Sequence, residues 1–391
     1  MSARDTMRFL GIARPELGDE EIDEVIDTLR SGWLTYGPKV QRFQAALSRY
    51  LETPYVRCLT SCTAGLSLAL QLHEIGPGDE VLLPANTFAA CANVVELRGA
   101  TPVFVDCDPR TGLVDLAHAE HLIGTRTRAL MAVHLAGHPV DLDVLARLGA
   151  RHGIAIVEDA AHAIGARWRG RPIGTGDNLC SFSFHATKNI TTIEGGALVV
   201  RTAEQAERVQ RLSLHGLSQS AWDRHGTTGP SHYDVLEPGF KYAMNDVSAA
   251  IGIHQLQRLD DWIDRREELS QAYDEQLAHL PLTLPAPAPA GARHARHLYP
   301  VLVDTDAAMS RNELAGALSC RNIGTSVHFH GAHLHRYYRE RYSIHPEDLP
   351  NSTDWADRAL TLPLHSGMDE TDVAMVSEAL TEILTYAGLS S

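Results

Sequence analysis

The chain has 391 residues, of which 44% are hydrophobic and 21% charged, and its formal net charge is −15 at pH 7. These proportions are typical of a globular protein, and the length allows two or three domains. The acidic excess argues against a nucleic-acid binder, because neutralising phosphates requires a basic face. The sequence shows no apolar run of about eighteen residues and no apolar signal segment at its start, so we expect no membrane association.

Two helices are predicted near the start of the chain. Within residues 17–30, Ile22, Val25, Ile26 and Leu29 recur at helical spacing. The glycine- and proline-containing stretch SGWLTYGP then predicts a loop, and VQRFQAALSRYL predicts a second helix.

From about residue 55 onward, short apolar runs alternate with helical stretches. Seven runs are strand candidates: YVRCLTSC, EVLLPA, TPVFVDCD, RALMAVHLAG, IAIVEDAA, LCSFSFHA and GALVV. Alternating strands and helices favour a mostly parallel sheet with helices on both faces, and near-continuous apolar runs are typical of strands buried on both sides. The predicted fold class is therefore α/β.

The C-terminal part predicts a second, smaller α/β domain. Residues 245–277 form a long amphipathic segment, and the Pro/Ala-rich stretch LPLTLPAPAPAGARHARH indicates a boundary loop. Beyond it, HLYPVLVD and GTSVHFH resemble strands, whereas SRNELAGALSC and DVAMVSEALTEILTYA resemble helices. We predict a large domain over residues 1–255, and a linking helix with a small domain over residues 256–391.

The cysteines and histidines do not predict a metal site. The six cysteines form no CxxC pair, which favours free thiols in a cytoplasmic protein. The 21 histidines include one dense cluster, VHFHGAHLH, but no HExxH motif, and their spacing argues against metal ligation.

The residues that follow the predicted strands form the candidate site, because open α/β sheets bind ligands outside the carboxyl ends of their strands. SCTAG opens a helix after the first strand; its free N–H groups suit a phosphate, and a simple N-cap is the alternative. Phe88 follows the second strand and either stacks on a flat ring or belongs to the core. Asp159 ends the fifth strand as either a surface carboxylate or a buried one that needs a partner.

Lys188 lies between two apolar runs, SFSF and GALVV. Considered by itself, Lys188 is either a surface charge on a hairpin or a nucleophile directed into a site. Together with Ser183, His185 and the groups above, it completes a set that fits pyridoxal phosphate (PLP). A lysine forms a Schiff base with the aldehyde, and a carboxylate keeps the pyridine nitrogen protonated so that the ring acts as an electron sink.

The chain resembles the DegT/DnrJ/EryC1/StrS sugar aminotransferases over nearly its whole length. The matching pieces, in order, are SGWLTYGP, TSCTAGLSLAL, GDEVLLPANTF, GATPVFVDCD, VEDAAHAIGA, SFSFHATKN, EGGALVV, GFKYAMNDVSAAIGIHQL, HLYPV, HFHGAHLHRYYRERY and LPLHSGM. The resemblance implies a fold type I PLP enzyme, with a mostly parallel seven-stranded sheet in its large domain and a small C-terminal α/β domain.

The resemblance also assigns roles to residues. Lys188 is the cofactor-binding lysine and the proton carrier, and Asp159 is the partner of the pyridine nitrogen. The other implied cofactor-binding residues are Thr63, Ala64 and Ser183 at the phosphate, Phe88 on the ring face, and His162 near the ring hydroxyl. His185, His328 and Tyr36 are implied as substrate-binding residues.

A homodimer with active sites shared between subunits is implied by the segment GFKYAM. The family's matching segment, GYNYRM, reaches into the neighbouring subunit's site. Lys241 replaces the common Asn and is carried over as a cofactor-binding residue. Ala243 replaces the common Arg, a departure that weakens the implied contact.

The implied reaction is transamination of a 4-keto nucleotide sugar with L-glutamate as donor, because SFHATKN, GFKYAMND and GTSVHFHGAHLHRYYRERY look most like 4-aminotransferases. A composition rich in Ala, Arg and Leu favours dTDP-4-keto-6-deoxy-D-glucose and secondary metabolism. A UDP-4-keto-pentose and a 3-keto sugar are alternative substrates.

Three further alternatives concern the class of protein. Dehydrating relatives carry His at the lysine position, so Lys188 argues against a sugar dehydratase. A regulatory protein without enzymatic activity is a second alternative. A nicotinamide-binding domain is a third, but no GxGxxG follows the first predicted strand.

Overall fold

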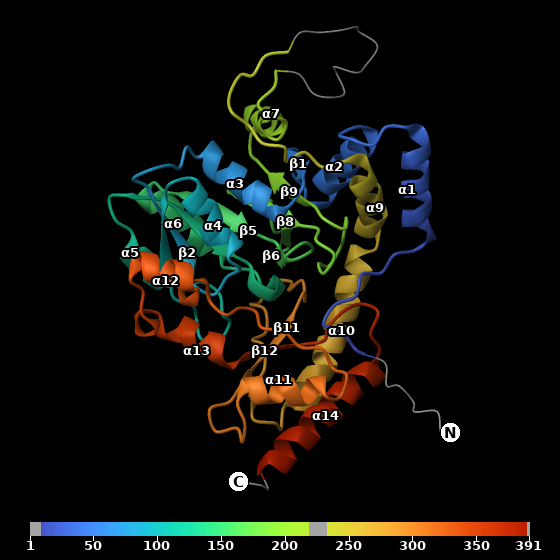
Figure 1. Cartoon of the computed structure of the whole chain (residues 1–391), viewed down its shortest axis with the longest axis vertical. Helices are drawn as coiled ribbons and strands as arrows, with labels where there is room; N and C mark the ends of the chain where they lie inside the picture. The colour runs from blue at the N-terminus through green and yellow to red at the C-terminus, as the bar shows by residue number, and fades with distance from the viewer. Residues whose placement is uncertain (1–8, 219–232, 389–391) are drawn as a thin grey trace.

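A seven-stranded sheet forms the centre of the larger part of the molecule (Figure 1). The computed structural model describes residues 9–218 and 233–388. The strands, in spatial order, are β1 (Val56–Leu59), β9 (Gly196–Val199), β8 (Leu179–Ser183), β5 (Ala155–Asp159), β4 (Thr127–Val133), β2 (Glu80–Pro84) and β3 (Thr101–Val105). Within the sheet, β9 alone runs antiparallel to its neighbours. The mostly parallel seven-stranded sheet predicted from the sequence is confirmed, and each of the seven predicted runs contains one strand.

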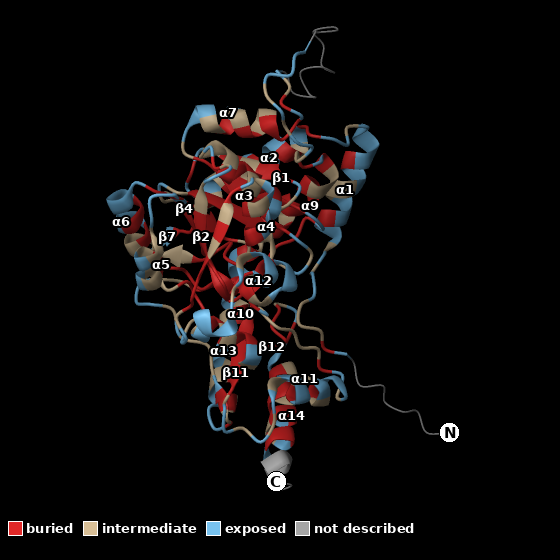
Figure 2. Cartoon of the chain, turned by 60° about the vertical axis from the view of Figure 1, so that its left-hand side comes forward, coloured by how far each residue is buried: buried red, intermediate tan, exposed pale blue. Residues whose placement is uncertain are grey.

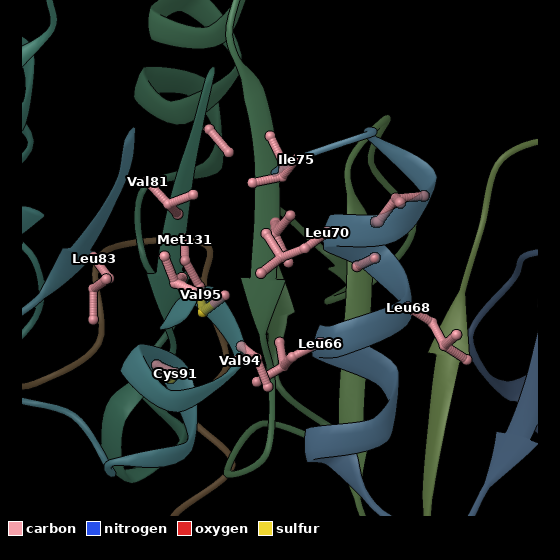
Figure 3. Packing of buried hydrophobic residues seen from close by; sticks show 14 of the residues in the cluster. Leu66, Leu68, Leu70, Ile75, Val81, Leu83, Cys91, Val94, Val95 and Met131 are labelled. Carbon is pink, nitrogen blue, oxygen red and sulfur yellow. The ribbon is translucent and has the colours of Figure 1, made fainter. Parts of the chain in front are cut away.

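Helices cover both faces of the sheet, and the strand residues alternate between them. Val81 and Leu83 pack under α3 (Cys62–Leu72), α4 (Ala90–Leu97) and α7 (Ala203–Leu212). Figure 3 shows this packing, with Leu66 of α3 beside Val94 of α4. Leu82, one residue along, instead belongs to the cluster on the opposite face, as the two-residue period of a strand requires.

Two helices cover the opposite face of the sheet, and three more lie toward its β1 edge. Helices α5 (Leu116–Leu122) and α6 (Leu142–His152) contribute to the cluster that contains Leu82. Helices α2 (Pro38–Tyr50) and α9 (Asp246–Gln257) pack near β1, β8 and β9, and α1 (Asp19–Ser31) lies against α9. A short hairpin, β6 (Arg167–Trp168) and β7 (Arg171–Pro172), follows β5.

A second body lies below the sheet in Figure 1 and has its own buried cluster. Its three-stranded sheet contains β10 (Leu282–Thr283), β11 (Tyr299–Val303) and β12 (Ala359–Leu362). Helices α11 (Arg311–Ser319) and α14 (Glu370–Gly388) pack on it, and α10 (Leu259–Leu277) leads into it. The described part of the chain also contains helices α12 (Arg336–Tyr342) and α13 (Pro350–Arg358) and three short 3-10 turns, 135–137, 332–334 and 346–348. In Figure 2, buried residues concentrate in the large sheet and along α10, β11 and α14.

The boundary between the two bodies is not a single point in the sequence. The predicted linking helix consists of two helices, α9 and α10, that meet at Arg258. Leu10, near the start of the chain, belongs to the buried cluster of the second body and bridges Ile323. The division at residues 255 and 256 stays a prediction. Within the described ranges, no helix has the length and apolar character needed to cross a membrane.

One predicted strand is wrong: GTSVHFH, residues 324–330, forms no strand. It has a single bridge, between Ser326 and Thr361. Side chains replace the expected ladder, because His328 Nδ1 lies 2.8 Å from Thr361 Oγ1 and the Phe329 N–H donates to Asn86 Oδ1 at 3.1 Å. These contacts turn the segment back toward the ends of the large sheet.

Candidate active site

A cavity of about 400 Å³ lies at the carboxyl ends of β4, β5 and β8. It is bounded by the start of α3, by the loop after β8 and by the segment that contains His328. Eight of the residues predicted for the site line it: Thr63, Phe88, Asp159, His162, Ser183, His185, Lys188 and His328. The structure therefore brings these eight predicted residues together around one cavity.

Lys188 lies in the loop between β8 and β9, and its side chain enters the cavity wall. The loop is a tight turn in which the Lys188 N–H donates to the His185 carbonyl at 2.9 Å. The next residue, Asn189, anchors it from behind by donating to the Ala295 carbonyl at 2.7 Å. Burial lowers the pKa of the Lys188 amine, and the nearby Asp159 charge opposes this effect only in part. The neutral amine, which is the nucleophilic and basic form, is thereby favoured.

Asp159 is the last residue of β5 and is 6% exposed, so the surface alternative is wrong. Its Oδ1 accepts the N–H of Ala161 at 2.9 Å. Two thiols also contact the carboxylate, Cys91 at 3.1 Å from Oδ2 and Cys62 at 3.6 Å from Oδ1. A buried carboxylate that keeps unused lone pairs toward a cavity suits a cationic ring nitrogen.

The N-terminus of α3 forms the third wall of the cavity. Ser61 caps the helix by accepting the Ala64 N–H at 3.1 Å, so that N–H group is already used. Gly196 allows strand β9 to pass close to the start of α3, because a Cβ at this position would lie only 2.4 Å from the Cys62 nitrogen. Thr63 lines the cavity in the first turn, where the helix dipole and free N–H groups favour a phosphate.

Neutral histidines complete the wall opposite the strand ends. His162 Nδ1 accepts the Ala136 N–H at 3.2 Å, so the neutral ring carries its proton on Nε2. The His162 ring stacks on Phe329 with centroids 5.9 Å apart, and His297 lies 4.6 Å away on centroids. Burial lowers the pKa of His162 well below its usual value and lowers that of His328 to about 4. Both rings therefore offer hydrogen bonds without charge at neutral pH.

Three predicted residues lie in different surroundings. Ala64 is buried behind the α3 terminus, and the structure places it outside the cavity lining. Tyr36 is buried in the core beside α2, where its hydroxyl accepts from Gln44 Nε2 at 3.3 Å. Lys241 is exposed, and its backbone bridges Leu214. The roles of Tyr36 and Lys241 stay predictions, since neither residue lines this chain's own cavity.

Phe88 lines the cavity mouth and is 63% exposed. Its ring centroid lies 6.0 Å from that of Phe329. Sequence reasoning did not identify Phe329, Glu194 or Cys91 as site residues. Glu194 and Phe329 lie within motifs that carry the family resemblance. Cys91, in the first turn of α4, belongs to no motif that indicates a functional site.

Comparison with known proteins identifies the chain. The sequence profile of the DegT/DnrJ/EryC1/StrS aminotransferase family matches residues 15–381. The chain belongs to this family. It is therefore a PLP-dependent aminotransferase of the sugar aminotransferase family, as the sequence resemblance predicted. Family membership also sets aside the nicotinamide-binding and regulatory alternatives.

Three relatives illustrate the likeness. The spore coat polysaccharide biosynthesis protein SpsC of Bacillus subtilis (strain 168) is 42% identical over 381 residues, which are 97% of this chain and 98% of SpsC. Spr1654 from Streptococcus pneumoniae, solved in its PMP form, has a TM-score of 0.91 and 33% identity, covering 98% of this chain and 100% of its own. DesV from S. venezuelae has a TM-score of 0.86 and 34% identity, covering 94% of each chain.

The residues around the cavity fit this cofactor. An amine, a buried carboxylate and a helix N-terminus border one space, and they are the partners that the aldehyde, the pyridine nitrogen and the phosphate of PLP need. The His162 Nε2–H would be a suitable donor for the ring's phenolic oxygen. Among the described residues, no group of three or more His, Cys, Asp or Glu side chains is arranged to hold a metal ion.

Proposed function

We propose that this enzyme transfers the amino group of L-glutamate to C4 of a 4-keto nucleotide sugar, with dTDP-4-keto-6-deoxy-D-glucose as the first candidate. One observation carries the proposal: Lys188 and Asp159 line a cavity together with His185 and His328, two histidines of the motifs that resemble 4-aminotransferases. The occurrence of SpsC in polysaccharide biosynthesis supports a sugar substrate.

Asp159 sets the electronic state of the site. Bound PLP supplies an electron sink for the carbon that carries the amino group. The Asp159 carboxylate would hold a proton at the pyridine nitrogen and so keep that sink effective. The carboxylate is fixed for this role by the Ala161 N–H, and its burial strengthens the pairing because the local dielectric is low.

Lys188 carries the proton that each half-reaction must move. Its free amine would move the proton between the amino-carrying carbon and the cofactor's C4′, acting as base and then as acid. Burial lowers the pKa of this amine, which favours its neutral, basic form. Asn189, the next residue, helps to fix the loop that carries this amine by donating to the Ala295 carbonyl.

The histidines hold the sugar in this proposal. A neutral imidazole both donates and accepts, as sugar hydroxyls do, so His328 suits a polyhydroxylated ring better than a cationic group would. His328 is oriented by its contact with Thr361 Oγ1. His185 is half-exposed at the cavity mouth, with Nε2 3.7 Å from Glu194 Oε1.

We further propose a homodimer in a reducing, cytoplasmic setting. Ile22 and Leu29 on α1 and Phe88 at the cavity mouth are each more than half exposed, and apolar side chains of this kind are typical of interfaces. Lys241 would then act in the partner's site. All six cysteines are free thiols, which supports a reducing compartment.

Single-turnover assays test the substrate. The enzyme is converted to its PMP form with L-glutamate and mixed with dTDP-4-keto-6-deoxy-D-glucose, with a UDP-4-keto-pentose or with a 3-keto isomer. We expect the first sugar to consume PMP at least about tenfold faster than the others, the discrimination that a few pocket contacts provide. NMR of the product should place nitrogen on C4. Faster consumption by the pentose, or nitrogen on C3, would establish the corresponding alternative instead.

A further inference from the structure

Two thiols contact the carboxylate of Asp159, and neither has a role in the proposed mechanism. Cys91 Sγ lies 3.1 Å from Oδ2, and Cys62 Sγ lies 3.6 Å from Oδ1. The backbone N–H of Ala161 is the strong donor of the set, at 2.9 Å from Oδ1. Oδ2 thus receives a thiol where most buried carboxylates receive an amide, a hydroxyl or a cation.

The hydrogen-bond pattern fixes which way the Cys91 proton points. Thr87 Oγ1 lies 3.1 Å from Cys91 Sγ. An ionised carboxylate accepts hydrogen bonds only, so the single thiol proton of Cys91 goes to Asp159 Oδ2, and the Thr87 hydroxyl donates to the sulfur. Cys91 is 0% exposed and lies behind the carboxylate, outside the cavity lining. It therefore acts on the cofactor only through Asp159.

Cys62 is the weaker of the two contacts. Its sulfur also lies 3.3 Å from Ser181 Oγ and 3.5 Å from the Ser181 carbonyl. The Ser181 hydroxyl donates to the Cys62 carbonyl at 3.0 Å, which leaves its oxygen as an acceptor for the thiol. One proton thus serves three acceptors, and Asp159 is the most distant of them.

Both thiols remain donors at neutral pH. Burial raises the pKa of each thiol well above its usual value, and the charge of Asp159 raises it further. A thiol is a weak donor, so it orients a carboxylate while withdrawing little of its charge.

We propose that Cys91 is a positioning residue: it fixes Asp159 through a weak donor and thereby leaves the carboxylate's charge to the protonated ring nitrogen of the cofactor. The proposal rests on PLP dependence and not on the identity of the sugar. A hydroxyl at the same place would bind Oδ2 more strongly and compete with the ring nitrogen. A methyl group would leave the charge intact and remove the orientation.

The test uses PMP labelled with ¹⁵N in the ring, bound to the full chain, with the ring nitrogen followed by NMR across pH. In Cys91→Ser, the proton affinity of the ring nitrogen should fall about three- to tenfold, the difference expected between a hydroxyl and a thiol on a carboxylate. In Cys91→Ala it should stay at or above the wild-type value, while the dissociation constant of PMP rises several-fold. In both variants kcat should fall, with KM for L-glutamate within about twofold of wild type.

The other titratable groups that face Asp159 are unchanged in these variants: Cys62 on α3, Cys180 on β8 and Lys188 after β8. Cys58→Ser and Cys58→Ala are matched controls, because Cys58 is equally buried, on β1, and its N–H pairs with Gln44. They should lower stability and leave the ring-nitrogen titration unchanged. Titration of Cys91→Ser at the wild-type pH would overturn the proposal, as would a lowered proton affinity in Cys91→Ala.

Discussion

The two sides of the active-site cavity are built differently. On the strand-end side, Asp159 and Lys188 belong to a strand and a tight loop of the large sheet, and backbone hydrogen bonds hold the segments around them. On the C-terminal side, His328 belongs to an irregular segment held by side chains, including Trp355 Nε1, which donates to the His328 carbonyl at 3.1 Å. In the proposed mechanism, the strand-end side carries the chemistry common to both half-reactions. We expect the C-terminal side to determine which sugar enters.

Replacement of Lys188 by alanine should have the largest effect, because both half-reactions need its amine. Turnover should fall by at least about a thousandfold, the range of a general acid–base group. Binding of PMP should persist, since Asp159 and α3 remain. Rates with L-glutamate and with the sugar are measured separately, together with PMP binding by equilibrium dialysis.

Lys39→Ala is the control, because Lys39 pairs with Glu24 on α1, outside the cavity. It should retain activity. Wild-type turnover in Lys188→Ala would remove this residue from the mechanism.

Asp159→Asn keeps the shape of the side chain and removes its charge. We expect kcat for both half-reactions to fall about a hundredfold, because the ring nitrogen loses the group that keeps it protonated. Asp106→Asn is the matched control: Asp106 is also buried, but it accepts N–H groups from Asn351 and Ser352. That variant should lose stability and keep the spectrum of the bound cofactor, whereas Asp159→Asn should change the spectrum. Equal kinetic losses in the two variants would reduce Asp159 to a structural role.

The burial of His328, on the C-terminal side, should affect how the free energy of unfolding depends on pH. The folded-state pKa of His328, about 4, lies below its unfolded value of 6.5, so the unfolded chain binds more protons between these values. Stability is therefore lost as pH falls from about 6.5 to about 4, by up to about 3 kcal/mol from this residue.

His328→Gln should flatten the dependence in that window, as measured by urea unfolding at several pH values. An unchanged slope in His328→Gln would contradict the burial argument.

Thr361→Val should have the smallest effect. It removes the hydroxyl beside His328 Nδ1 and keeps the shape of the side chain within β12. We expect KM for the sugar to rise about threefold and the rate with L-glutamate to stay unchanged. Thr283→Val on β10, whose hydroxyl bonds Asp304 instead, is the comparison. If Thr361→Val changed the half-reactions with the sugar and with L-glutamate equally, the proposed difference between the two sides would be contradicted.

The residues of the strand-end side can be predicted from the sequence because the patterns that mark them are local. Apolar runs mark buried strands, and parallel strands carry the residues that follow them to one edge, so Asp159, Ser183 and Lys188 were expected together. The C-terminal side depends on contacts across more than two hundred residues, such as Asn86 with Phe329. The spacing of apolar residues along the chain does not indicate such contacts. The residue pattern of GTSVHFH predicts a strand instead. Cys91 was missed for the same reason, since its role arises from Asp159, 68 residues away.

The attachment point of the cofactor tests the central claim most directly. The chain has three lysines, Lys39, Lys188 and Lys241, and only Lys188 lines the cavity among these three. Borohydride treatment of the PLP-loaded enzyme fixes the lysine–cofactor bond, and peptide mass spectrometry then locates the added mass. We predict that the mass lies on the peptide containing Lys188. Stoichiometric attachment at Lys39 or Lys241 would contradict the site described here.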